Sequence, residues 1–305
     1  MVKSRSLLVC CAAYCAAALA AVAVCRLTAG LSPVWSAGLA DLAATLVVFA
    51  FSVGLNNSSM YDPYWSVAPV LITLWWLARF GGVGGAAGIG DAVGAGGATA
   101  VRQIAVTVLV CAWAARLTWN WLRRWKGIAD EDWRYADYRR LGAGYWPVSF
   151  LGFHLMPTVL VFTACLSLVP SLSSTSRATG ILDVLAVVVT AAAITVEAAA
   201  DRQLRRFLSS TRKPGRILDT GLWALSRHPN YFGEVLFWWG LWLFGLAADP
   251  SRWWTVVGPA GITALFLGIS VPMMDKRMLS RHPGYAEHMS RRSGFFPWIT
   301  RKDET

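Results

Sequence analysis

Charged residues are scarce in this 305-residue sequence. Asp, Glu, Lys and Arg make up 15% of it, whereas they make up about 25% of an ordinary soluble domain. Acidic residues number only 17, and His occurs four times. This shortage of charge excludes a disordered chain and a coiled coil, since both are rich in charged residues. A collagen-like fibre is excluded too, because 27 glycines fall far below one residue in three.

The six cysteines lack the spacing of a metal site or a disulfide framework. None belongs to a C-x-x-C pair, no His stands at ligand spacing from one, and all lie within or at the ends of apolar runs. We interpret them as small buried hydrophobic side chains and expect no metal. They are Cys10, Cys11, Cys15, Cys25, Cys111 and Cys165.

Hydrophobic residues are abundant instead, at 56% of the chain with a mean hydropathy of +0.47. Stretches long enough to cross a bilayer contain about 17–25 apolar residues. The sequence therefore predicts an all-α, polytopic transmembrane helix bundle with about 7–8 spans. Two stretches are short, so one of them could be partly re-entrant. The stretches are roughly 6–25, 38–55, 66–80, 101–121, 151–170, 181–199, 231–247 and 253–274.

The net charge of +11 is distributed unevenly along the chain. With eight spans and a cytoplasmic N-terminus, 22 of the 28 basic residues face the cytoplasm and five face the other side; Arg116 lies within a span. This bias is typical of cytoplasmic loops. It predicts that both termini are cytoplasmic, and it explains the charge without nucleic acid. The basic segments are 1–5, 122–150, 200–230 and 275–305.

The first apolar stretch resembles a secretory signal, because Lys3 and Arg5 precede an Ala-rich core. A cleaved signal is one alternative. Seven further hydrophobic stretches favour a retained helix, so we treat residues 1–36 as an extra N-terminal transmembrane helix and 37–305 as the catalytic domain.

Asp62 is the only charged residue in the loop before the third stretch. An acid near membrane depth is expensive and usually functional. The alternative is a helix cap, since Asp followed by Pro63 begins helices well. The two roles are compatible.

Two acids and a basic cluster mark the cytoplasmic end of the sixth stretch. Glu197 and Asp201 are four residues apart and share one helix face. Arg212 follows in an Arg-Lys-Pro-Gly sequence that could bind phosphates or, as an amphipathic surface, anionic lipid headgroups. The two acids favour a ligand site, because attraction to lipid does not need them.

The strongest local pattern is Arg227-His228-Pro229-Asn230-Tyr231, which leads into the seventh stretch with Gly233-Glu234. Asn230 can cap that helix, and Glu234 then lies one turn inside it. A plain helix start would not require both polar residues, so we expect a functional site here. A partial echo of the pattern runs from Ser280 to Glu287.

These residues resemble the steroid 5-alpha-reductase-like family of membrane proteins, in its bacterial and protist branch. The Arg-His-Pro-Asn-Tyr sequence alone is shared with isoprenylcysteine and phospholipid methyltransferases. The resemblance covers about residues 40–300 and rests on Asp62 with Trp65 and Pro69, Arg116-Leu117, Glu131 to Tyr135, Glu197 to Gln203, Arg227 to Glu234, Tyr285, and Phe296-Pro297-Trp298.

The resemblance implies an enzyme that takes NADPH from the cytoplasm and reduces an activated carbon–carbon double bond in a lipid. Asp62 occupies the place of an acid that contacts the substrate carbonyl. Trp113 stands where steroid reductases carry a Tyr that donates to the same carbonyl, which puts a 3-oxo-steroid in doubt. The cofactor-binding residues that it implies are Glu197, Asp201, Arg212, Arg227, His228, Asn230, Glu234 and Tyr285.

The function expected from the sequence is therefore an integral membrane NADPH-dependent oxidoreductase acting on a lipid or sterol. One alternative is an S-adenosylmethionine-dependent isoprenylcysteine or lipid methyltransferase, and another is a non-catalytic lipid-binding protein. The expected partners are a hydrophobic substrate and membrane lipids, with no nucleic acid and no obligate protein partner. The expected location is the endoplasmic reticulum in a eukaryote and the plasma membrane in a bacterium.

Overall fold

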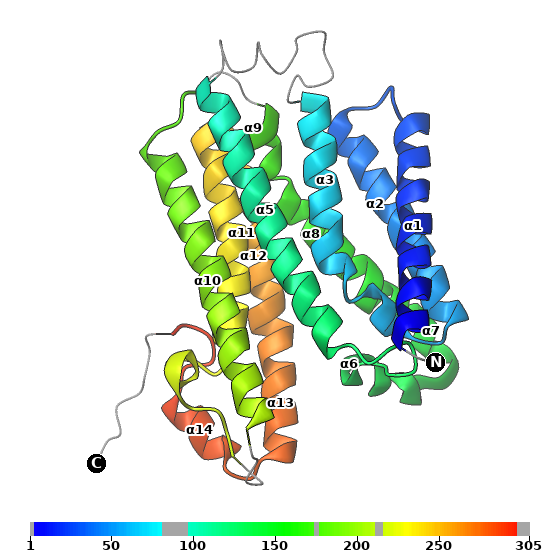
Figure 1. Ribbon diagram of the computed structural model, residues 1–305, viewed down its shortest axis with the longest axis vertical. Helices are drawn as coiled ribbons and strands as arrows, with labels where there is room; N and C mark the ends of the chain where they lie inside the picture. The colour runs from blue at the N-terminus through cyan, green and yellow to red at the C-terminus, as the bar shows by residue number, and fades with distance from the viewer. Residues whose placement is uncertain (1–2, 81–96, 174–176, 211–215, 298–305) are drawn as a thin grey trace. The chain divides into compact units, whose positions relative to one another are not determined.

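The computed structural model describes residues 3–80, 97–173, 177–210 and 216–297. Within them the named elements are all helices, and the one β-bridge joins Ser226 to Ser293 (Figure 1). The longer helices are α1 (Lys3–Leu27), α2 (Pro33–Gly54), α3 (Tyr64–Phe80), α5 (Gly97–Arg124), α8 (Met156–Cys165), α9 (Leu168–Ser173), α10 (Ile181–Ser209), α11 (Pro229–Ala248), α12 (Val257–Leu265), α13 (Val271–Arg281) and α14 (Tyr285–Arg291).

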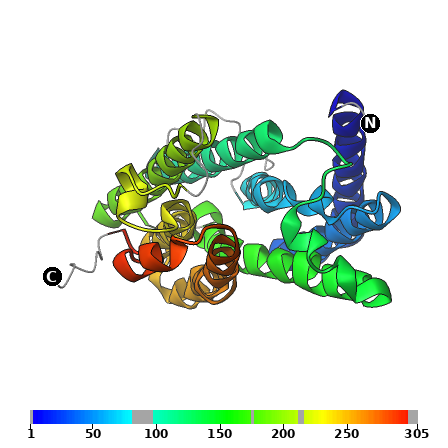
Figure 2. The same cartoon turned by 90° about the horizontal axis from the view of Figure 1, so that it is seen from below.

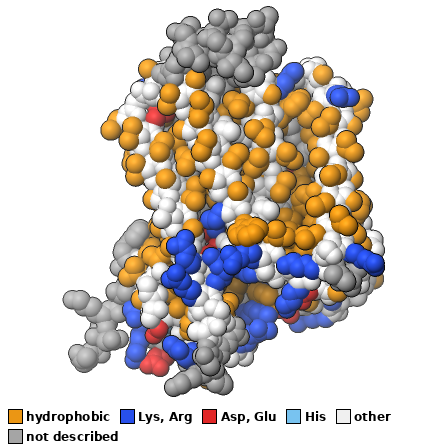
Figure 3. Space-filling model, viewed as in Figure 1, with side chains coloured by type: hydrophobic (Ala, Val, Ile, Leu, Met, Phe, Trp, Pro, Cys, Tyr) orange, Lys and Arg blue, Asp and Glu red, His pale blue; other side chains and the backbone are white. Residues whose placement is uncertain are grey.

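Each of the eight predicted apolar stretches is helical, which confirms the all-α membrane bundle. Among the described residues, seven helical segments are long and apolar enough to cross a membrane. The exception is α3, whose 17 residues extend about 26 Å. Figure 3 shows hydrophobic side chains over the middle of the helices and Lys and Arg side chains gathered toward their lower ends.

The chain divides into two compact units, residues 1–178 and 179–305. In the first unit, the start of α1 lies beside the end of α5. Lys3 donates a hydrogen bond to the Leu122 carbonyl at 3.0 Å, and the Ile128 amide donates to Ser6 Oγ at 3.3 Å. The N-terminal basic residues and the 122–150 segment therefore share one end of this unit, as the charge pattern predicts.

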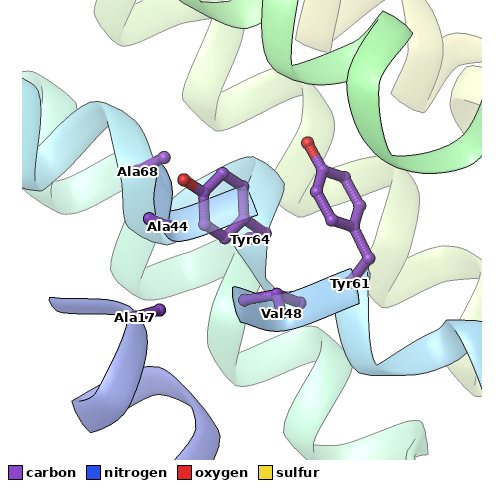
Figure 4. Packing of buried hydrophobic residues seen from close by; sticks show 6 residues of the cluster. All are labelled: Ala17, Ala44, Val48, Tyr61, Tyr64 and Ala68. Atoms are coloured by element: carbon purple, nitrogen blue, oxygen red, sulfur yellow. The ribbon is translucent and has the colours of Figure 1, made fainter. Parts of the chain in front are cut away.

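Small residues pack the N-terminal helix into the first unit. Ala17 of α1 and Ala44 and Val48 of α2 form a buried cluster with Tyr61 and Tyr64, completed by Ala68 of α3 (Figure 4). Alanine side chains are small, so they let the helices approach closely. In a membrane this van der Waals packing holds helices together, because lipid provides no hydrophobic driving force between them. The helix expected to be an extra N-terminal element thus packs within the same unit as α2 and α3.

In the second unit, α10 and α11 run side by side along their lengths (Figure 1 and Figure 2). Two glycines of α11 allow the approach. A Cβ atom at Gly233 would lie 2.8 Å from Glu197 Cβ and 3.0 Å from the Ala193 carbonyl oxygen, and one at Gly240 would clash with Thr190. The start of α11 is therefore held against the face of α10 that carries Glu197.

Gly233→Ala should destabilise the protein by about 1–3 kcal/mol, the range for overpacking a tight core contact. Backbone atoms of α10 meet the new methyl group, so no side-chain rotation relieves it. The matched control is Gly268→Ala, where nothing lies within 4 Å. Thermal unfolding in detergent should show a lower midpoint only for Gly233→Ala, and equal midpoints would contradict the packing.

Candidate functional site

The loop before α3 is fixed by hydrogen bonds to a second loop of the first unit. Asn57 caps the 3-10 helix η1 (Ser58–Tyr61) by accepting from the Ser59 amide at 2.7 Å, and it donates to the Ile128 carbonyl at 2.6 Å. The Asp132 amide donates to Ser59 Oγ at 2.8 Å. Residues 57–59 and 128–132 are thereby joined, and Asp62 follows directly.

The Asp62 carboxylate accepts two hydrogen bonds from the second loop. Tyr135 donates its hydroxyl to Asp62 Oδ1 at 2.5 Å, and Arg134 donates Nη2 to the same oxygen at 3.2 Å. Among the described residues, Asp62 accepts no bond from the first turn of α3. A cap on α3 therefore does not account for this side chain.

Asp132 orients Arg134 against Asp62. Asp132 Oδ1 caps the short helix α6 (Trp133–Ala136) by accepting from the Arg134 amide at 2.9 Å, and it also accepts from Arg134 Nε at 2.8 Å. The guanidinium is therefore shared between two carboxylates. Because Asp132 partly neutralises Arg134, the guanidinium stabilises the anionic form of Asp62 less than it would in a pair of its own.

Burial raises the pKa of Asp62 to about 6, because loss of water outweighs the lowering effects of Arg134 and of the Tyr135 hydrogen bond. The side chain is only 16% exposed. Burial and the nearby Asp62 raise the pKa of Tyr135 as well, so this phenol stays protonated. The pair therefore consists of a dependable hydrogen-bond donor and a carboxyl group that titrates just below neutral pH.

Among the described residues, Asp62 has hydrogen bonds with Tyr135 and Arg134 but none with Trp113. Trp113 is completely buried in α5. The sequence could have indicated a role for Tyr135, because Glu131 to Tyr135 is a dense mixture of charged and aromatic residues. This mixture alone does not distinguish a functional segment from a solvated loop.

Sequence reasoning missed a second polar cluster of the first unit. Asp41 is buried in α2, and its Oδ1 accepts from the Tyr64 hydroxyl at 2.6 Å. Thr158 of α8 hydrogen-bonds Thr45 at 2.8 Å and Tyr61 at 2.6 Å. An acid alone within the 38–55 stretch could have indicated this cluster.

The second unit contains the residues predicted to bind the cofactor. Glu197 and Asp201 are buried one turn apart on α10, and Glu234 is buried on α11, where it accepts from Trp238 Nε1 at 3.0 Å. Asn230 Oδ1 is buried and accepts no hydrogen bond from the described residues. Arg212 lies outside the described residues, so its predicted phosphate contact stays a prediction.

Arg227, His228 and Tyr285 converge on Asp275 of α13. Arg227 Nη2 lies 2.7 Å from Asp275 Oδ2, while His228 Nε2 and the Tyr285 hydroxyl lie 2.9 and 2.7 Å from Oδ1. Burial raises the pKa of Tyr285, and its bond to Asp275 adds to the effect. These three residues thus share one buried carboxylate, and their predicted role at the cofactor stays a prediction.

Arg227 also fastens the C-terminal segment of the second unit. Its Nη1 donates to the carbonyls of Met289 and Arg292 at 3.1 and 2.8 Å, and its amide donates to the Ser293 carbonyl at 2.9 Å. Ser226 donates to the Phe295 carbonyl at 2.9 Å. The Arg-His-Pro turn thus joins α11, α13 and the segment after α14.

Comparison with known proteins gives a family match and a distant relative. The model of the family described as "Protein of unknown function (DUF1295)" matches residues 48–292. The "Uncharacterized protein C594.04c" of Schizosaccharomyces pombe is 26% identical over 274 residues, which cover 82% of this chain and 76% of that protein. No solved structure matches the chain.

Proposed function

The chain belongs to the DUF1295 family, and from that premise we propose that it is an integral membrane oxidoreductase that uses NADPH to reduce an activated carbon–carbon double bond of a lipid or sterol. The resemblance to steroid 5-alpha-reductase-like enzymes supports the reaction class. The seven apolar helices support a substrate that is taken from the membrane.

The observation that carries the proposal is the buried hydrogen bond between Asp62 and Tyr135. When a hydride adds to the β-carbon of an enone, negative charge develops on the carbonyl oxygen. A protonated Asp62 would donate to that oxygen, and Tyr135 and Arg134 would hold the carboxyl group in place. A proton from water or a side chain must then reach the α-carbon to complete the reduction.

The second unit offers acceptors that suit a dinucleotide. The buried Asn230 Oδ1, which has no donor among the described residues, can accept from an amide or a ribose hydroxyl. Buried carboxylates on α10 and α11 can accept from further hydroxyls. NADPH would supply the hydride, and we assign its contacts to Glu197, Asp201, Asn230 and Glu234, with Arg212 on a phosphate.

Binding to detergent-purified protein distinguishes the candidate functions. We expect NADPH to bind more tightly than NADH, and S-adenosylmethionine not to bind. Asn230→Ala should weaken NADPH binding about tenfold, because one hydrogen bond to a buried acceptor is lost. The control is Ser280→Ala, which removes an exposed hydroxyl of α13.

Tight binding of S-adenosylmethionine without NADPH would replace the proposal with a methyltransferase. Absence of binding by all three compounds would favour a non-catalytic lipid-binding protein. A reductase that binds NADPH should also oxidise it when lipid enones are supplied, and a protein that binds NADPH without any such turnover across the panel would contradict the proposed substrate class.

A further inference from the structure

A cavity of about 360 Å³ lies in the first unit, at the end opposite Lys3 and Asp62. It is formed by the end of α1, the turn to α2, the start of α2 and the end of α3. These ends are joined by a hydrogen bond from Trp76 Nε1 to the Pro33 carbonyl at 3.1 Å. Among the residues lining the cavity are Arg26, Thr28, Ser36, Trp75 and Arg79.

The chemistry of the cavity wall suits an anion. Arg26 and Arg79 come from different helices, and none of the described residues that line the cavity is acidic. Arg79 lies over the Trp75 ring at 5.6 Å, which orients its guanidinium. The buried Trp75 Nε1 has no acceptor among the described residues. Two cations therefore line the pocket beside an indole N–H that has no acceptor, and the described part of the wall contains no carboxylate.

The hydroxyl groups of the wall are already occupied. Thr28 donates to the Val24 carbonyl at 2.6 Å, and Ser36 lies 2.8 Å from Thr28 Oγ1. They close the turn between α1 and α2 and leave the guanidinium groups as the main binding groups. Guanidinium binds phosphate oxygens with paired, charge-assisted hydrogen bonds.

The surroundings indicate a membrane-interface site. Leu27, Leu31 and Trp35 are 87%, 48% and 71% exposed beside the cavity. Exposed Leu and Trp at helix ends are typical of the boundary between acyl chains and headgroups. By the charge distribution this is the side with few basic residues, so two arginines in one pocket are not explained by the general cytoplasmic bias.

We propose that this cavity binds the phosphate-bearing headgroup of an anionic phospholipid, with Arg26 and Arg79 on the phosphate and the acyl chains along the exposed apolar residues. Two cations without an acid favour a net negative headgroup over a zwitterionic one. Because α1 precedes the family match at residue 48, the site depends on residues outside the family region. It is independent of the proposed oxidoreductase activity.

The test titrates phosphatidylglycerol into the full-length protein in phosphatidylcholine nanodiscs and measures bound lipid by native mass spectrometry. We expect selective retention of phosphatidylglycerol. Arg26→Gln and Arg79→Gln should each weaken it about tenfold, the loss of one charged hydrogen bond. The matched control is Arg177→Gln, an exposed arginine at the same end of the unit that does not line the cavity.

Three results would overturn the proposal. Equal retention of phosphatidylcholine would remove the requirement for negative charge, and an equal loss in Arg177→Gln would show general electrostatic attraction. Competition by inorganic phosphate at the concentration of the lipid would identify a free anion as the occupant. Arg26→Lys with Arg79→Lys keeps both charges and should retain binding more strongly than the double Gln variant.

Discussion

Replacing Asp62 with Asn should lower the turnover of a lipid enone by about 100-fold or more, while NADPH affinity stays near that of the wild type. The substitution keeps the size of the side chain but replaces the carboxylic acid with an amide, which still donates an N–H but cannot transfer a proton to the developing oxyanion. Losing the contribution of one oxyanion-stabilising group typically lowers the rate 10²–10³-fold. The measurement is NADPH oxidation with a panel of lipid enones, with Asp130→Asn as control because Asp130 is an exposed acid of the neighbouring loop.

The pH profile gives this prediction a second readout. With a pKa of about 6, Asp62 is protonated below that pH and ionised above it. Wild-type turnover should therefore be flat below pH 6 and fall roughly tenfold per pH unit above it. The residual rate of Asp62→Asn should lack this limb. Equal rates for both proteins would assign Asp62 a structural role.

Asp62→Asn should keep or raise the stability of the protein although it lowers turnover. Because folding raises the pKa of Asp62 above its unfolded value of 3.8, its contribution to stability is fully present below about pH 4 and is lost as pH rises through 6. The loss is about 3 kcal/mol at most. Asp62→Asn avoids it, so that variant should unfold at the same or a higher temperature than wild type at pH 8. A less active but more stable protein is typical of a functional site.

The long helices of the bundle were predictable because each contains an apolar stretch, and a bilayer requires backbone groups to be hydrogen-bonded within the segment. The shared end of Lys3 and the 122–150 segment in the first unit followed from the basic residues, which gather on one side of a membrane. The shortness of α3 was visible in the sequence as well, because 66–80 is one of the two short stretches. The described part of α3 has 17 residues, at the lower limit for a span.

The contacts of the candidate site could not be predicted, because they join loops that are far apart in the sequence. Asp62 was recognised by its isolation, whereas its partner Tyr135 is 73 residues away. Asp275 was placed in a basic cytoplasmic segment, so its role as the common partner of Arg227, His228 and Tyr285 went unrecognised. Hydropathy is averaged over a window of neighbouring residues. It therefore does not reveal that one buried acid contacts three donors from distant parts of the sequence.

Removing the charge of Asp275 should produce the largest loss of stability in the second unit. Arg227 and Asp275 are only 11% and 8% exposed, and His228 and Tyr285 share the same carboxylate. Asp275→Asn leaves a buried guanidinium without its counter-ion, which typically destabilises a protein by about 3–5 kcal/mol. Thermal unfolding and limited proteolysis of the segment after α14 should both report it.

The matched control is Glu287→Gln, which breaks the ion pair with Arg291. That pair is as short as the buried one, at 2.7 Å, but its side chains are 65% and 55% exposed, so the expected loss is below about 1 kcal/mol. Similar losses in both variants would contradict the importance of burial. If Arg227 and His228 stabilise the fold through Asp275 and do not contact the cofactor, the folded fraction of Asp275→Asn should bind NADPH with nearly wild-type affinity. A selective loss of NADPH affinity without a loss of stability would instead assign the network to the cofactor.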